Sequence, residues 1–165
     1  MILVKSICSL ISSGTELKVF KGMFDNSSPL DVNIKGMADK AMKYPLTYGY
    51  SLVGVVTKCA SDVIDRYEIL GQLVFAFSPH ASLTILDRDA IQLVPAGISP
   101  EDAVFMPSVE TALSVVHDAQ IRMGENVAIY GQGLIGLLVN AIVSLENQIM
   151  GLFVPVRSAK ASKVN

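Results

Sequence analysis

The chain has 165 residues, with 13 Lys and Arg against 15 Asp and Glu, a net charge of −2. No block of basic residues offers an electrostatic footprint for a phosphate backbone or an anionic lipid surface, so neither nucleic acid nor a membrane is an expected partner. A content of 51% hydrophobic and 17% charged residues is typical of a folded protein, long enough for one domain and part of a second. The two cysteines, Cys8 and Cys59, lie in no CxxC or Cys/His cluster, which favours a reducing, cytoplasmic compartment.

The first hundred residues show short apolar runs separated by turn residues. The opening of the chain contains Lys5 and lacks a cleavage pattern, so it is interpreted as a strand and not as a secretory signal. Gly54 lies inside a β-branched run and predicts a bulge or a close backbone approach. Residues 24–48 are predicted to be irregular, with a short helix near Met37–Lys43. Strands are predicted over Leu3–Ile11, Leu52–Lys58, Leu73–Phe77, Leu83–Leu86 and Ile91–Val94, which indicates a barrel or a sandwich.

From Ser99 onward the pattern changes to helices. Ser99-Pro100-Glu101-Asp102 combines a capping hydroxyl, an N1 proline and two carboxylates, which predicts a helix start. Pro107 should end this short helix and begin another, whose apolar face is predicted to carry Ala112, Val115, Val116 and Ala119.

The next segment predicts a strand, a helix and a second strand, at Asn126–Gly131, Gly133–Leu145 and Ile149–Val154. The nineteen residues Val127–Leu145 carry no charge, and by length alone could form a transmembrane helix. The glycines of GQGLIG, residues 131–136, favour the strand–turn–helix interpretation.

A GxGxxG motif between a strand and a helix is typical of dinucleotide binding. Gly131 would make the tight turn, Gly133 would let the backbone approach a diphosphate, and Gly136 would let the helix pack on its strand. The free N–H groups of the helix start, at Leu134 and Ile135, would face the negative charge. The alternative is that these glycines only pack a helix on a sheet.

Five patterns, in this order, resemble the medium-chain dehydrogenase/reductase superfamily. They are SGTELKVFKG (13–22), GYSLVGVV (49–56), LGQLVFAF (70–77), LVPAGISPEDAVFMPSVETALSVVHDA (93–119) and GENVAIYGQGLIG (124–136). The resemblance implies an α+β fold: a GroES-like, partly open β-barrel substrate domain over residues 1–98, followed over residues 99–165 by linker helices and an incomplete Rossmann-type βαβ unit. It also implies that strands are missing at both ends of the chain.

The chain departs from the zinc-dependent members of that superfamily. The positions of their catalytic zinc ligands and of a nearby acidic residue are similar to Ser13, Tyr50, Pro107 and Ser51 here. The loop after Phe77, where a cysteine-rich zinc lobe is expected, contains no cysteine, so no metal and no zinc are predicted. His80, in that loop, could face the substrate, but both His80 and His117 are interpreted as surface or hydrogen-bonded residues and receive no ligand role.

Without zinc, the resemblance implies an NAD(P)-dependent oxidoreductase that transfers hydride between NADPH and a carbonyl or enone. Hydrogen bonds must then polarise the substrate oxygen, and the candidates are Tyr50 and Thr15, with Glu16 and Glu110 as orienting groups. Tyr50 could equally be a tyrosine packed at a strand end, and the two glutamates could be simple capping or surface residues.

The cofactor type depends on the residues after the second strand. An acidic residue that would hold the ribose of NAD is absent there, whereas Arg157, with Ser158 and Lys160, would suit the 2′-phosphate of NADP. NADP is therefore favoured over NAD, with an ordinary solvated tail as the alternative.

An incomplete Rossmann half would leave apolar faces uncovered, in agreement with a mean hydropathy of +0.48. A homo-oligomer formed through those faces is one expectation. The alternative to an enzyme is a non-catalytic barrel that serves as a binding or interaction module, or an inactive fragment of such an enzyme.

Overall fold

The computed structural model describes residues 1–24, 43–122 and 125–146. Within them the chain forms two compact units that divide between Phe105 and Met106. The first unit is built on an antiparallel sheet and the second on two helices, as the mixed α+β class requires.

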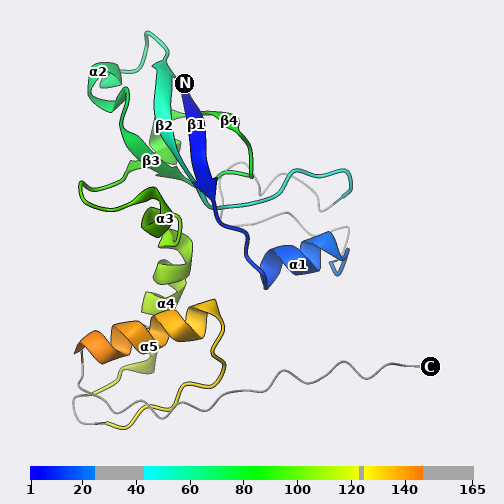
Figure 1. The fold of residues 1–165 in the computed structure, drawn as a ribbon, viewed down its shortest axis with the longest axis vertical. Helices are drawn as coiled ribbons and strands as arrows, with labels where there is room; N and C mark the ends of the chain where they lie inside the picture. Colours follow the sequence, from blue (N-terminus) through cyan, green and yellow to red (C-terminus); the bar gives the residue numbers. More distant parts are fainter. Residues whose placement is uncertain (25–42, 123–124, 147–165) are drawn as a thin grey trace. The chain divides into compact units, whose positions relative to one another are not determined.

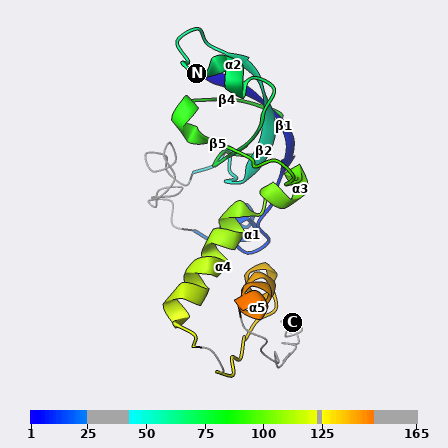
Figure 2. The ribbon, with the colours of Figure 1, turned by 90° about the vertical axis from the view of Figure 1, so that its left-hand side faces the viewer.

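Five strands form the sheet of the first unit, in the order β4-β1-β2-β3-β5. Figure 1 labels the first four strands, and Figure 2 labels β5. All four pairings are antiparallel. The strands predicted from the sequence are confirmed to within two residues at each end. Their bounds are β1 Ile2–Ser9, β2 Leu52–Cys59, β3 Leu73–Ala76, β4 Leu83–Leu86 and β5 Ile91–Leu93.

The core of this unit lies on one face of the sheet. Alternate residues of each strand point to that face, so β1 contributes Ile2 and Val4. Side chains from the connections complete the cluster, which also contains Leu52, Val56, Val63, Ile69, Val74, Ala76 and Ile91. Burial of these branched side chains is the main force that holds the sheet together.

Gly54 marks a close backbone approach in the sheet. A Cβ atom there would lie 2.5 Å from the carbonyl oxygen of Lys5. The β1–β2 register also shifts between Ser6 and Cys8, beside Gly54. The prediction of a bulge or a close approach at Gly54 is confirmed.

A helix that was not predicted, α1 (Thr15–Phe20), follows β1. The Thr15 N–H donates to Ser12 Oγ at 3.3 Å just before the first turn. The sequence SSG suggested only a break, and six residues are too few for an apolar period to appear. A second short helix, α2 (Arg66–Ile69), precedes β3, and a 3₁₀ turn (Arg88–Ala90) precedes β5. The helix predicted near Met37–Lys43 falls at residues 37–42 outside the described part.

The helix start predicted at Ser99 is confirmed. Its side chain accepts a hydrogen bond from the N–H of Asp102 at 3.1 Å and caps α3 (Pro100–Ala103). Helix α4 (Met106–Ala119) then begins, with Pro107 in its first turn, where a missing N–H removes no helical bond.

In the second unit, α4 packs beside α5 (Leu134–Glu146), as Figures 1 and 2 show. Ala112 and Val116 of α4 meet Val139 and Val143 of α5 in the core. The predicted apolar face of α4 is thus right at Ala112 and Val116, one turn apart. It is wrong at Val115, which is 47% exposed, and at Ala119, which is also exposed. The contact with α5 follows the i, i+4 row of Ala112 and Val116 instead.

The segment before α5 has the alternation of a strand. Val127 and Ile129 pack on the helix cluster, whereas Tyr130 is 80% exposed. Within the described residues, the predicted strand Asn126–Gly131 is not formed. A strand requires hydrogen bonds to a neighbouring strand, and the expected neighbour, Ile149–Val154, lies outside the described residues. Since α5 begins at Leu134, residues 127–145 are not a single helix. In the described ranges, every helix is too short or too polar to cross a bilayer.

Replacement of Gly54 by alanine should weaken the β1–β2 pairing, because the new methyl group would overlap the Lys5 carbonyl. We expect the free energy of unfolding to fall by about 1–3 kcal/mol. The matched control is Gly14→Ala, where nothing lies within 4 Å of the added atom. Urea unfolding of both variants measures the difference, and equal midpoints would contradict the close approach.

Candidate functional site

The glycine motif forms a sharp turn before α5. Gly131 has a φ of 94°, which favours glycine. A Cβ atom on Gly136 would lie 1.8 Å from the carbonyl oxygen of Gly131, so the turn packs directly on the first turn of the helix. Both positions therefore need glycine for structural reasons.

Gly133 differs from its two neighbours in the motif. Its carbonyl accepts the N–H of Leu137 at 2.9 Å, so it begins the helix, yet nothing lies within 4 Å of an added Cβ atom. The first turn of α5 contains no acidic side chain, and its free N–H groups include those of Leu134 and Ile135. An anion could be accepted here. Arg157, Ser158 and Lys160 lie outside the described residues.

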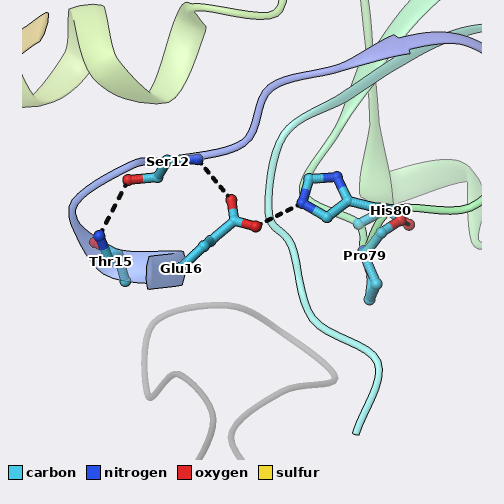
Figure 3. Close-up of polar contacts among 6 residues, drawn as sticks. Ser12, Thr15, Glu16, Pro79 and His80 are labelled. Atoms are coloured by element: carbon cyan, nitrogen blue, oxygen red, sulfur yellow. Dashed lines mark hydrogen bonds and ion pairs between the residues drawn. The ribbon is translucent and has the colours of Figure 1, made fainter. Parts of the chain in front are cut away.

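A second group of polar side chains lies in the first unit, around Glu16 (Figure 3). One carboxylate oxygen, Oε1, accepts the backbone N–H of Ser12 at 2.8 Å. The other, Oε2, lies 2.7 Å from Nε2 of His80. The side chains of Glu16 and His80 are only 11% and 27% exposed, so the pair is largely shielded from water.

The sheet register explains why His80 lies there. β2 and β3 pair Leu52 with Ala76, and the same register continued beyond the strand ends places Tyr48 opposite His80. The N–H of His80 indeed donates to the Tyr48 carbonyl at 3.2 Å. The sequence predicts a surface or hydrogen-bonded residue at His80, and the contact with Glu16 confirms the second. The pairing of β2 with β3 is the signal that could have placed His80 in this group.

Gly49 completes the arrangement. Its φ is 127°, and a Cβ atom there would lie 2.7 Å from both Cδ2 and Nε2 of the His80 ring. The imidazole thus packs directly on the backbone of residue 49, next to Tyr50. Three segments that are far apart in the sequence, residues 12–16, 48–50 and 78–80, meet through this ring.

The other expected site residues have different surroundings. Tyr50 is half-buried, and its ring meets that of Tyr48 edge-on at 6.4 Å. Thr15 is exposed, and Ser51 is buried with its hydroxyl donated to the Val104 carbonyl. Glu16 contacts Ser12 and His80, so it orients an imidazole. The roles of Tyr50 and Thr15 stay predictions.

Residues expected on α4 belong to the second unit. Glu110 and His117 are both exposed, and the neighbouring Thr111 donates its hydroxyl to the Pro107 carbonyl at 2.9 Å. Over the described ranges, no group of three or more His, Cys, Asp or Glu side chains could hold a metal ion.

Gly49→Ala should lower the free energy of unfolding by more than the unfavourable positive φ alone would. The control is Gly97→Ala, since Gly97 also has a positive φ, of 90°, but nothing lies within 4 Å of an added Cβ atom. We expect about 1 kcal/mol of destabilisation for Gly97→Ala, and about 2 kcal/mol or more beyond that for Gly49→Ala. Chemical unfolding measures both, and equal losses would show that the His80 ring does not press on Gly49.

No protein-family model matches the chain. Among curated proteins, D-guloside 3-dehydrogenase of Escherichia coli (strain K12) is 33% identical over 91 residues, which cover 53% of this chain and 25% of that protein. A probable D-xylulose reductase A of Aspergillus clavatus is 25% identical over 130 residues, 61% of this chain and 36% of the relative.

Solved structures share the fold. The CurF ER cyclopropanase from the curacin A pathway gives a TM-score of 0.71 at 22% identity, covering 91% of this chain and 45% of that one. The Bacillus subtilis 2R,3R-butanediol dehydrogenase gives a TM-score of 0.68 at 18% identity, over 88% of this chain and 48% of that one. The Thermus thermophilus quinone oxidoreductase gives a TM-score of 0.60 at 20% identity, over 91% of this chain and 43% of that one.

The chain spans 25% of the length of D-guloside 3-dehydrogenase and less than half of each of these solved structures. Its structural neighbours are medium-chain dehydrogenase/reductase enzymes with GroES-like and Rossmann domains, and its curated relatives are members of the same superfamily. The chain is similar to them over the residues that it shares with them.

Proposed function

We propose that the protein is an NADP-dependent oxidoreductase that transfers hydride between NADPH and a carbonyl or enone without zinc. The observation that carries this proposal is the glycine turn at the start of α5. Gly131 and Gly136 are required by the backbone, but the space beside Gly133 is open. Such a turn leaves helix N–H groups free for a diphosphate, so the residues present fit the cofactor.

Two observations support NADP over NAD. Arg157, Ser158 and Lys160 offer positive charge and a hydroxyl after the expected second strand, with no acidic residue between Phe153 and Lys160. In addition, one structural neighbour, the quinone oxidoreductase of Thermus thermophilus, was solved in complex with NADPH.

The proposed substrate is a small carbonyl compound. The relatives are named for guloside and xylulose, and one structural neighbour for quinone, so ketoses and enones are the classes to test. Of the positions that resemble those of the zinc site in zinc-dependent members, Ser13, Tyr50 and Ser51 carry hydroxyl groups. Tyr50 and Thr15 would donate hydrogen bonds to the substrate oxygen. Cys8 and Cys59 are both unpaired, which fits the reducing cytoplasm.

Titration of the purified chain with NADPH, followed by nicotinamide fluorescence, tests cofactor binding. We expect saturable binding, and Gly133→Ala should weaken it at least about tenfold, since the methyl group would occupy the approach to the diphosphate. Gly14→Ala, also open around its added atom, is the control. A flat titration of folded protein would contradict the proposal and favour a non-catalytic binding module.

Tyr50→Phe removes the hydroxyl proposed to polarise the substrate oxygen. We expect kcat for NADPH oxidation with an enone or a ketose to fall by about 10–1000-fold, with little change in the Kd for NADPH. The matched control is Tyr67→Phe, on α2, whose side chain is 81% exposed. Unchanged turnover in Tyr50→Phe would exclude Tyr50 as the donor.

A further inference from the structure

His80 and Glu16 have the arrangement of an acid–base pair. A carboxylate that is ionised can only accept hydrogen bonds, so the 2.7 Å contact requires that Nε2 of His80 carries the hydrogen. Glu16 is itself fixed by the Ser12 N–H at 2.8 Å. The carboxylate therefore selects one tautomer and one orientation of the ring, as a third group does in nucleophile–base–acid triads.

The second ring nitrogen has no such partner. Nδ1 of His80 is buried and makes no hydrogen bond to any residue that the structure describes. In the neutral ring selected by Glu16, this atom holds a lone pair, and a buried acceptor without a donor is destabilising. The other edge of the ring, Cδ2 and Nε2, packs on the backbone of Gly49, beside Tyr50. The imidazole as a whole therefore lies among the residues expected to face the substrate.

We propose that His80, oriented by Glu16, is the acid–base residue of the reaction, with Nδ1 as the atom that exchanges a proton with the substrate oxygen. This role rests on the proposed hydride transfer. Tyr50 would polarise the same oxygen by a hydrogen bond, whereas His80 would supply the proton. Catalytic hydrogen bonds often form only in the complex with substrate, so Nδ1 gains its partner when the substrate oxygen enters.

In the direction of reduction, hydride arrives at the carbonyl carbon, and the C=O π pair moves to the oxygen. That oxygen takes the proton from Nδ1 of the imidazolium, and the N–H bonding pair stays on the ring. His80 becomes neutral with its Nε2–H still bound to Glu16, and solvent later returns a proton. One carbonyl, one NADPH and one proton give one alcohol and one NADP⁺.

The hydrogen bond between Glu16 and His80 can be tested without an activity assay. The chain contains only two histidines, so the ring nitrogens of ¹⁵N-labelled protein can be assigned with His80→Gln. We expect the neutral ring of His80 to carry its hydrogen on Nε2 and none on Nδ1. Glu16→Gln should weaken this preference, because an amide can donate as well as accept. His117, exposed on α4, is the internal control and should show the tautomer mixture of free imidazole. An Nδ1–H tautomer for His80 would overturn the proposal.

The catalytic role is tested by NADPH oxidation with 3-penten-2-one and with D-xylulose. We expect His80→Gln to lower kcat by about 10²–10⁴-fold and to flatten the pH profile of kcat, because the amide can still donate to Glu16 but cannot carry the proton. Glu16→Gln should lower kcat at least about tenfold, since the tautomer is released. The controls are His117→Gln, exposed on α4, and Glu68→Gln, exposed on α2.

The outcomes separate this inference from the proposed function. Loss of turnover in His80→Gln, with an unchanged Kd for NADPH and an unchanged Tm, supports it. Retained turnover, an unchanged pH profile, or a wild-type chain that binds NADPH but reduces neither carbonyl would overturn it while cofactor binding stands. A wild-type chain that binds no NADPH would contradict the proposed function and the catalytic role together.

Discussion

The register of β2 with its two neighbours is the constraint on which the rest of the first unit depends. β2 pairs antiparallel with β1 and with β3, and both pairings include Gly54. The carbonyl oxygen of Lys5 lies so close to Gly54 that a Cβ atom there would overlap it. Ser9 lies opposite Leu52, and Leu52 lies opposite Ala76. The last residue of β1, the first of β2 and the last of β3 therefore lie at the same end of the sheet. The residues just beyond those ends form the polar group at Glu16 and His80.

That end of the sheet shows how an imidazole and a carboxylate from distant parts of the sequence can meet. Glu16 comes from the helix after β1 and His80 from the loop after β3, 64 positions apart in the sequence. Gly49 lies against the His80 ring and has no side chain, which leaves room for the ring. The glycine turn of the second unit works by the same principle, because Gly136 is needed where Gly131 approaches α5.

Much of the fold could be predicted from the sequence, because its signals are local. Alternating apolar residues located the strands, and Ser99-Pro100 located the start of α3. Helix α1 was missed because six residues carry no clear period. The strand predicted at Asn126–Gly131 has the right alternation, but a strand also needs a partner, and the expected one lies outside the described residues. The site was harder to predict: Glu16 was a candidate, but His80 depends on a register that only the paired strands reveal.

Glu16 and His80 should therefore stabilise the first unit as a coupled pair. A double-mutant cycle with Glu16→Ala, His80→Ala and the double variant, followed by urea unfolding, measures this coupling, because neither alanine can make the hydrogen bond. We expect a coupling free energy of about 1 kcal/mol or more, since a largely shielded hydrogen bond to a charged group joins the two side chains. Strictly additive losses would show that the two side chains do not interact.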